Sequence, residues 1–247
     1  MAVLEVDKLG IAFGGLRALE DVCFKVEEGS IVGLIGPNGA GKTTVFNLLT
    51  GVYTPTEGTI RLNGESILKK KTYQITRSGL ARTFQNIRLF KDMTVIDNVK
   101  TAMNSRMKYS AFSGIFRLPS YRKEEDQVTA RAMELLDVFG LSGQAGDLAR
   151  NLPYGKQREL EIARALASSP KVLLLDEPAA GMNPTETQSL LEAVRLIRER
   201  FQVSVLLIEH DMNFVMGLCE HIIVLDYGRI IAEGPADEIR RNPKVIA

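Results

Sequence analysis

The segment SIVGLIGPNGAGKTTVFNLLTG, residues 30–51, decides the fold class of this chain. It begins with an apolar run, SIVGLIG, that predicts a short buried strand, and it ends with KTTVFNLLTG, which predicts a helix. Between them, Gly36, Gly41, Lys42 and Thr43 have the spacing Gly-x4-Gly-Lys-Thr. A glycine-rich loop between a strand and a helix lets backbone N–H groups surround a phosphate. The segment therefore predicts a nucleoside triphosphate site in an α/β domain.

The side chains of this loop have separate expected roles. Lys42 would reach the β- and γ-phosphates of the nucleotide, and the hydroxyl group of Thr43 would ligate Mg²⁺. The other expected contacts to the nucleotide come from the remaining loop residues, Gly36, Pro37, Asn38, Gly39, Ala40, Gly41 and Thr44. A chance glycine-rich turn is the alternative, and the strand before the loop and the helix after it both argue against it.

A second apolar strand, KVLLLDEP at 171–178, ends in two adjacent acids. Asp176 at the carboxyl end of this strand would lie beside the phosphate loop and hold Mg²⁺, usually through water. Glu177 would face an attacking water and polarise it. A solvated strand end could also carry two acids. Their position after four apolar residues, in a chain that has a phosphate loop, favours the functional interpretation.

The rest of the chain shows two strand-rich regions separated by a helical one. The strands at 31–35, 172–176 and 203–208 are almost wholly apolar, as central parallel strands buried on both faces are. Other strands are predicted at 2–9, 19–29 and 58–64 and in a hairpin at 221–234. The apolar spacing is helical from about 93 to 167 and again at 184–201. This order predicts an α/β fold with a helical insertion.

Composition and charge exclude several classes of protein. The chain has 31 basic and 30 acidic residues, and a net charge of +1 leaves no excess for holding a nucleic acid by its phosphates. Cys23 and Cys219 stand in apolar surroundings, so both are expected to be buried, reduced thiols in the cytosol. The N-terminus does not have the pattern of a signal peptide, and no apolar run approaches the roughly 20 residues that a membrane helix needs.

Six motifs, in their order along the chain, resemble those of the ATP-binding subunits of ABC transporters. They are the phosphate loop, RTFQN at 82–86, LPYGK at 152–156, the two acids at 176–177, AGMN at 180–183 and His210. The resemblance covers essentially the whole chain and implies ATP and Mg²⁺ as cofactors.

The same resemblance implies one nucleotide-binding domain over residues 1–247. Its ATP-binding core, at about 1–86 and 168–247, would be a P-loop NTPase core with a mostly parallel central sheet and an N-terminal antiparallel β subdomain. The helical subdomain that carries the signature motif would be inserted at about 87–167.

The resemblance also assigns roles to residues outside the phosphate loop. Gln85 would contact Mg²⁺ and relay the state of the nucleotide to the membrane subunit, and His210 would contact the γ-phosphate. Phe13 would stack on the adenine, and Arg17 would touch the same base. The implied D-loop residues are Gly181, Met182 and Asn183. With Lys42 and Glu177, Gln85 and His210 make up the expected catalytic group.

Residues 152–156 correspond to the signature usually written Leu-Ser-Gly-Gly-Gln. In the nucleotide-bound dimers of the family, which are head-to-tail, the signature helix of one subunit caps the γ-phosphate held by the other. The implied signature residues are Leu152, Pro153, Tyr154, Gly155 and Lys156. Pro153 and Tyr154 replace Ser and Gly, Lys156 stands where Gln is usual, and Asn183 replaces the D-loop Asp. Without the serine hydroxyl, backbone N–H groups and Lys156 would have to meet the γ-phosphate, and a proline is tolerated in a first helical turn.

Three longer segments narrow the resemblance to the ATP-binding subunits of branched-chain amino-acid (LIV) ABC transporters, and among these to the LivG-like ATPases. They are LPYG-x-QR-x-LEIARAL, FGGLRAL and ARTFQNIRLFKDMTVIDNV. Such importers combine two ATPases, two membrane permeases and a soluble solute-binding protein. The resemblance implies a cytoplasmic subunit, peripheral on the inner face of the cell membrane, that hydrolyses ATP to energise import. It leaves open whether the ATPase pair is a homodimer or a heterodimer.

Two other functions are weighed against this one. A non-transport ABC ATPase of DNA repair or translation tends to carry a long coiled coil or two tandem ATPase domains, whereas this chain has one phosphate loop and no sustained heptads. A kinase or GTPase with a phosphate loop is the third candidate, but no guanine-binding Asn-Lys-x-Asp is present. Residues 103–123 mix methionine, aromatic and basic side chains, and either a groove for a permease helix or a plain surface segment would explain them.

Overall fold

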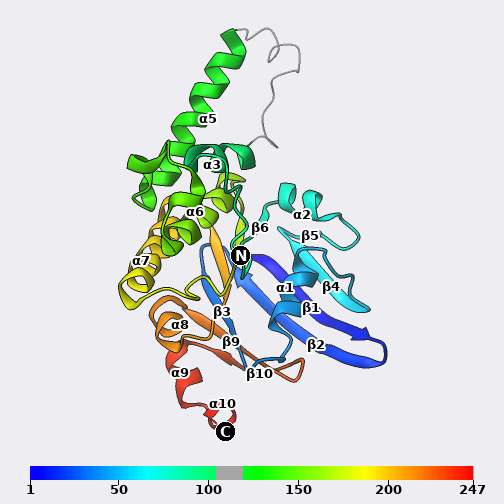
Figure 1. Cartoon of the computed structure of the whole chain (residues 1–247). Coiled ribbons are helices and arrows are strands. Elements are labelled where there is room, and N and C mark those ends of the chain that lie inside the picture. The colour runs from blue at the N-terminus through cyan, green and yellow to red at the C-terminus, as the bar shows by residue number, and fades with distance from the viewer. Residues whose placement is uncertain (104–118, 247) are drawn as a thin grey trace. The chain divides into compact units, whose positions relative to one another are not determined.

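The computed structural model describes residues 1–103 and 119–246 (Figure 1). The chain divides into two compact units, which are described separately. The first consists of Met1–Gln85 and Pro170–Ala247, and the second of Asn86–Ser169. Most of the segment 103–123, expected to form either a permease groove or a surface segment, lies outside the described residues.

The first unit is built on a six-stranded sheet in the order β10-β9-β3-β8-β7-β6. Its strands are β3 (Ile31–Ile35), β6 (Leu80–Arg82), β7 (Val172–Asp176), β8 (Ser204–Ile208), β9 (His221–Asp226) and β10 (Arg229–Gly234). All neighbours pair in parallel except β10 with β9. Every residue of β3, β7 and β8 is buried, which confirms the predicted central strands.

A four-stranded antiparallel sheet in the order β2-β1-β4-β5 belongs to the same unit. Its strands are β1 (Ala2–Phe13), β2 (Leu16–Glu27), β4 (Glu57–Leu62) and β5 (Glu65–Ser66). β1 ends at Phe13, four residues beyond the predicted strand, because it continues through several register shifts to a tight glycine turn. The hairpin therefore pairs Ala12 with Arg17 and Phe13 with Leu16.

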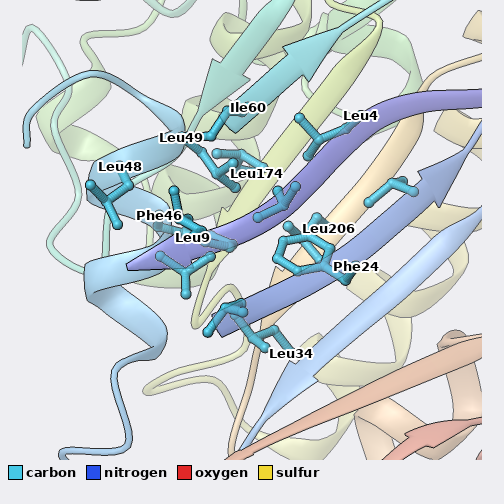
Figure 2. Packing of buried hydrophobic residues seen from close by; sticks show 14 of the residues in the cluster. Leu4, Leu9, Phe24, Leu34, Phe46, Leu48, Leu49, Ile60, Leu174 and Leu206 are labelled. Atoms are coloured by element: carbon cyan, nitrogen blue, oxygen red, sulfur yellow. The ribbon is translucent and has the colours of Figure 1, made fainter. Parts of the chain in front are cut away.

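Helix α1 (Lys42–Leu49) packs in the core between these two sheets (Figure 2). Phe46 and Leu49 of α1 are fully buried with Leu174 and Leu206 of the parallel sheet and with Leu9 of the antiparallel sheet. Burial of each such side chain stabilises the fold by about 1.5–3 kcal/mol. The helix that follows the phosphate loop is thus anchored along its apolar face.

The remaining helices of the first unit follow the strands of the parallel sheet. They are α2 (Thr72–Ser78), α7 (Pro184–Phe201), α8 (Met212–Leu218), α9 (Ala236–Arg241) and α10 (Pro243–Ile246). The bounds of α7 are those predicted, since Asn183 and Glu186 form a capping box and Pro184 occupies the first helical position.

The second unit is helical. Its described elements are α3 (Val95–Met103), α5 (Pro119–Val138), η2 (Ser142–Gln144), η3 (Ala149–Asn151) and α6 (Tyr154–Ala167). Pro153 is the N-cap residue of α6 and has an extended backbone (ψ 156°). It therefore lies just before the first helical turn and not inside it. The proline's missing N–H group therefore lies outside the helix.

The two cysteines differ in burial, so the expectation that both are buried is wrong for Cys23. Cys23 is exposed, whereas Cys219 is buried. β2 alternates, with Val22 and Phe24 buried and the side chain of Cys23 on the opposite face. The apolar neighbours of Cys23 in the sequence thus belong to the other side of the strand.

Candidate nucleotide-binding and catalytic site

The phosphate loop joins β3 to α1 and lies against two other strands. Gly36 (φ 148°) has no room for a side chain, because a Cβ atom there would clash with the carbonyl oxygen of Leu225. At Gly41 (φ 109°) a Cβ atom would lie 2.7 Å from Leu19 of β2. The N–H of Gly228, in the turn between β9 and β10, donates to the carbonyl of Ala40 at 2.9 Å. The loop requires glycine at both positions and is supported from β2 and from the hairpin.

Lys42 points back into the loop that it follows. Its Nζ donates to the carbonyl oxygens of Gly36 at 2.7 Å and Pro37 at 2.9 Å, and the residue is 6% exposed. Burial lowers the pKa of Lys42, and the carboxylates of Glu177 and Asp176 oppose this shift. The ammonium group thus lies where loop carbonyls and two acids surround it.

The exposure of the other loop residues varies. Pro37, Asn38, Gly39 and Thr43 are exposed, and Ala40 is buried. Gly36, Gly41 and Thr44 are half-buried.

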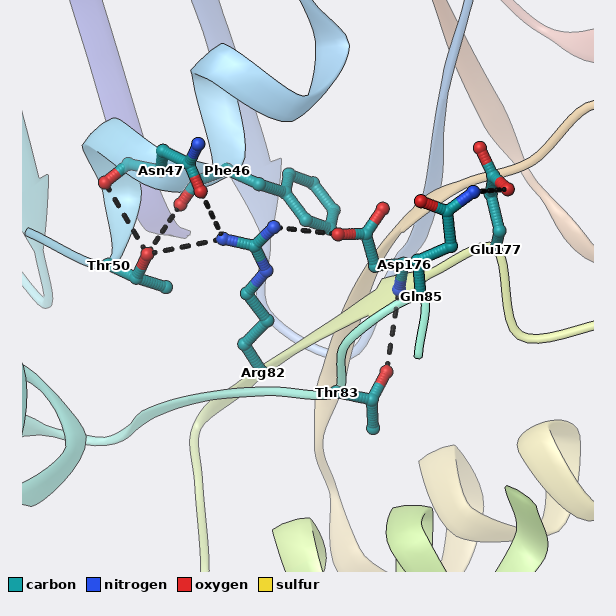
Figure 3. Close-up of polar contacts among 8 residues, drawn as sticks. All are labelled: Phe46, Asn47, Thr50, Arg82, Thr83, Gln85, Asp176 and Glu177. Carbon is teal, nitrogen blue, oxygen red and sulfur yellow. Dashed lines mark hydrogen bonds and ion pairs between the residues drawn. The ribbon is translucent and has the colours of Figure 1, made fainter. Parts of the chain in front are cut away.

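Glu177 is contacted by two other predicted site residues. One carboxylate oxygen accepts a hydrogen bond from Nε2 of Gln85 at 2.7 Å, drawn in Figure 3, and the other lies 2.9 Å from Nε2 of His210. Gln85 follows β6 closely, Glu177 follows β7 and His210 follows β8. These three parallel strands end at one edge of the sheet, and their register pairs Asp176 with Ile208. Residues from three separate motifs thus meet at the carboxyl edge.

Glu209 was missed by sequence reasoning and joins two of these loops. It is 4% exposed, and its Oε1 accepts a hydrogen bond from the N–H of Ala179 at 2.7 Å. Its Oε2 accepts from the N–H of His210 at 2.9 Å. An acid directly after the buried strand β8 was an available signal, analogous to Asp176 after β7. Glu209 links the D-loop side of β7 to the backbone of His210.

Arg82 was also missed, and it contacts the predicted magnesium ligand (Figure 3). Its Nη2 lies 2.6 Å from Oδ2 of Asp176, and the two side chains are 5% and 6% exposed. Nη1 donates to Oδ1 of Asn47 at 2.8 Å. Arg82 stands in the RTFQN segment, three residues before Gln85. The acid predicted to hold Mg²⁺ is therefore one partner of a buried ion pair.

The predicted adenine residues lie at the tip of the β1–β2 hairpin, and each has a partner there. The ring of Phe13 packs edge-on against Tyr53, with centroids 5.2 Å apart and planes at 70°. Arg17 forms ion pairs with Glu57 at 2.6 Å and Glu20 at 3.3 Å. Tyr53, which follows α1, is a further aromatic residue at this position that the sequence reasoning missed.

The five signature residues lie in the second unit, at the start of α6. Leu152 and Gly155 are buried, whereas Pro153 and Tyr154 are exposed. Nζ of Lys156 donates to the carbonyl of Phe139 at 2.9 Å and to Glu159 at 2.6 Å, so this side chain is held within its own unit. The N-cap residue of α6, Pro153, forms no side-chain capping bond. The first backbone N–H groups of the helix are therefore the donors that this turn presents.

The three D-loop residues belong to the first unit and precede α7. Gly181 has a left-handed backbone (φ 78°) and is exposed, and Met182 is half-buried. Oδ1 of Asn183 accepts a hydrogen bond from the N–H of Glu186 at 3.0 Å. Asparagine and aspartate cap helices equally well, which explains structurally how Asn183 can stand where the family has Asp.

The site combines a glycine-rich loop with a glutamate, a glutamine and a histidine that meet at the carboxyl edge of the parallel sheet. This combination defines a nucleotide-binding protein of the phosphate-loop class. Within that class the chain belongs to the ABC transporter family, because the family model described as "ABC transporter" matches residues 19–180. A second model, described as "Branched-chain amino acid ATP-binding cassette transporter", matches residues 229–247.

Curated relatives and solved structures agree with this assignment. The chain is 47% identical over 244 residues to the high-affinity branched-chain amino acid transport ATP-binding protein BraF of Pseudomonas aeruginosa, covering 99% of this chain and 96% of that protein. The identity and coverage are the same for LivG of Escherichia coli K12. A solved ATP-binding cassette of an ABC transporter, in its ADP conformation, matches with a TM-score of 0.86 at 31% identity, covering 100% of this chain and 97% of that one.

These comparisons bear out the α/β cassette fold expected from the sequence and the choice of a transport ATPase over a DNA-repair or translation ATPase. Within the described residues, no helix has both the length and the apolar character needed to cross a membrane.

Proposed function

We propose that the chain is the ATP-hydrolysing subunit of an ABC importer for branched-chain amino acids. The observation that carries the enzymatic part is the Glu177 carboxylate, which Gln85 and His210 contact at the edge of the sheet beside the phosphate loop. The substrate class rests on the names of the relatives.

The site residues supply most of what phosphoryl transfer needs, which is positioning and charge stabilisation. Lys42 and the loop N–H groups neutralise the β- and γ-phosphates, and Glu177 orients and polarises the attacking water. His210 contacts the γ-phosphate and holds the Glu177 carboxylate in position. Phe13 stacks on the adenine beside Arg17.

Mg²⁺ fits the residues assigned to it, because Thr43, Gln85 and Asp176 offer hydroxyl, amide and carboxylate oxygens, the ligand types that this ion prefers. The described residues contain no cluster of three or more acidic, histidine or cysteine side chains that would hold a metal by itself. When bound, Mg²⁺ supplies charge neutralisation on the phosphate oxygens.

The partners follow from the family. Two membrane permeases and a second ATP-binding subunit complete the transporter on the inner face of the cell membrane, and a solute-binding protein delivers the amino acid. In the closed dimer the first N–H groups of α6, at Tyr154 and Gly155, meet the γ-phosphate held by the other subunit. Lys156 contributes by holding α6 to its own unit, and no nucleic acid is involved.

Glu177→Gln tests this function. The variant keeps the shape of the side chain but removes the base, so it is expected to bind ATP, to lose turnover by at least about a hundredfold and to accumulate as an ATP-bound dimer. Size-exclusion chromatography with light scattering, with ATP in the absence and then in the presence of Mg²⁺, measures the dimer. An ATP-dependent dimer means that this chain forms the nucleotide-bound dimer with a second copy of itself. A monomer that still binds ATP means that a different ATPase is required as partner.

Glu233→Gln is the matched control, because Glu233 also contacts a histidine, His221, at 3.0 Å, but at the amino end of β9. It is expected to keep turnover. Unchanged hydrolysis in Glu177→Gln would contradict the catalytic assignment.

A further inference from the structure

Arg82 is a buried arginine at the end of β6 that the mechanism above does not use. Its side chain is 5% exposed, and its guanidinium lies over the rings of Phe46, at 5.4 Å from the centroid, and Phe84, at 5.0 Å. A charge removed from water is stable only when it is paired. The partners of this guanidinium therefore determine its role.

The guanidinium joins α1 to the end of β7 (Figure 3). Nη1 donates to Oδ1 of Asn47 at 2.8 Å and lies 3.4 Å from Oγ1 of Thr50, which caps the end of α1. Nη2 lies 2.6 Å from Oδ2 of Asp176. The donors of an arginine form a rigid planar fork, so these contacts constrain one another. The Asp176 carboxylate is thereby tied to the helix that begins at the phosphate loop.

Arg82 engages only one oxygen of this carboxylate. Within the described residues no protein donor contacts the other oxygen, Oδ1. The backbone N–H of Asp176 lies 3.4 Å from Oγ1 of Thr83, the residue after Arg82, so the same segment also contacts its main chain. A charged donor on one oxygen orients a carboxylate and leaves the second oxygen for a cation or for the water bound to it.

We propose that Arg82 is a positioning residue that orients the Asp176 carboxylate toward Mg²⁺ and so determines how strongly Mg²⁺ enhances ATP binding. The inference rests on the proposed function, in which Asp176 holds the cation. Repulsion between the guanidinium and Mg²⁺ acts in the opposite direction. Orientation outweighs it because the arginine charge is already matched by the carboxylate at 2.6 Å, whereas without Arg82 the carboxylate has no donor that fixes its direction.

The test measures ATP affinity twice, in EDTA and in Mg²⁺, by isothermal titration calorimetry in the Glu177→Gln background, which prevents turnover. The dissociation constant in EDTA divided by the dissociation constant in Mg²⁺ gives the enhancement of ATP binding by Mg²⁺. Arg82→Met is expected to lower this ratio by about 10- to 100-fold, as the loss of a residue that orients a metal ligand does, and to leave Mg-free ATP affinity unchanged. Arg82→Lys keeps the charge but not the fork, so an intermediate ratio is expected.

Arg198→Lys is the matched control, because Arg198 pairs with Glu220 on the surface and is expected to keep the parental ratio. If the methionine variant fails to fold, the lysine variant carries the test, and a parental ratio in it would overturn the inference. A purely structural role predicts a lower melting temperature with an unchanged ratio, which would also overturn it, as would a raised ratio. If the parent itself shows no effect of Mg²⁺, the magnesium role proposed for Asp176 fails together with the inference, and this is seen before any Arg82 variant is measured.

Discussion

Glu177 combines an unfavourable backbone with a well-held side chain. Its φ of 47° is left-handed, a conformation that costs a residue with a side chain about 1–3 kcal/mol. Its N–H group donates to the carbonyl of Ile208 at 2.9 Å, and its carboxylate contacts Gln85 and His210. These bonds offset the strain. The turn directs the carboxylate away from the strand and toward the two residues that orient it.

Tyr53 packs against Phe13, the residue proposed to stack on the adenine, and this contact allows a second test at the residue scale. Edge-to-face aromatic pairs contribute about 0.5–1.5 kcal/mol. Tyr53→Leu is therefore expected to weaken ATP binding by roughly 2- to 10-fold by loosening the Phe13 ring. It should leave the binding of inorganic triphosphate unchanged, because the phosphate loop is intact.

Competition titrations with ATP and triphosphate measure this difference. Tyr73→Leu is the control, because Tyr73 is an exposed tyrosine of α2 whose ring faces Arg77. If Tyr53→Leu weakened the binding of ATP and of triphosphate equally, the proposed role of Tyr53 beside the adenine would be contradicted.

At the scale of elements, the phosphate loop, the signature motif and the D-loop each lead into a helix, and each of these helices has its own stabilising contacts. α1 is held by the core, and α6 is held partly by Lys156 and by the buried ion pair between Arg158 and Glu161 at 2.9 Å. α7 is held by the capping box of Asn183 and Glu186. The loop between β7 and α7 is short, and its residue Ala179 is bonded to Glu209.

Substitutions of Asn183 distinguish its capping of α7 from a contribution to the ATPase dimer. Asn183→Ala removes the side-chain acceptor of the α7 cap and should lower the free energy of unfolding by about 1 kcal/mol. Asn183→Asp keeps an acceptor and should be close to neutral in stability. Chemical denaturation of both variants measures the cap. If alanine is as stable as asparagine, the capping box contributes nothing, and a lower ATPase rate at equal stability would assign Asn183 to the dimer.

At the scale of the whole molecule, the two cysteines report on folding. The native protein should react with a thiol reagent at the exposed Cys23, while the buried Cys219 should react only when denaturant is added. Burial, with a smaller effect from the carboxylates of Glu220 and Glu209, raises the pKa of Cys219 from 9.0 to about 12. The folded state thus holds this proton more tightly than the unfolded state does.

The sign of the pH dependence follows from this shift. The stabilising contribution of Cys219 is complete below pH 9 and is lost as the pH rises from 9 to about 12. Unfolding measured across this range should therefore show a steeper alkaline loss of stability in the native sequence than in Cys219→Ala. Parallel curves for the two proteins, or two rapidly reacting thiols in the native state, would contradict the burial of Cys219.

The sequence by itself determined the phosphate loop, the apolar parallel strands, the helix at 184–201 and the order of the motifs. These features are local, because glycine spacing, apolar period and capping residues act within a few positions. The wrong expectation, a buried Cys23, came from a strand whose two faces have different neighbours. Only the tertiary structure placed Arg82 on Asp176 and Tyr53 on Phe13, and turned Lys156 toward Phe139. Each of these contacts joins side chains from different elements, and which side chains meet depends on how the elements pack rather than on any pattern along the chain.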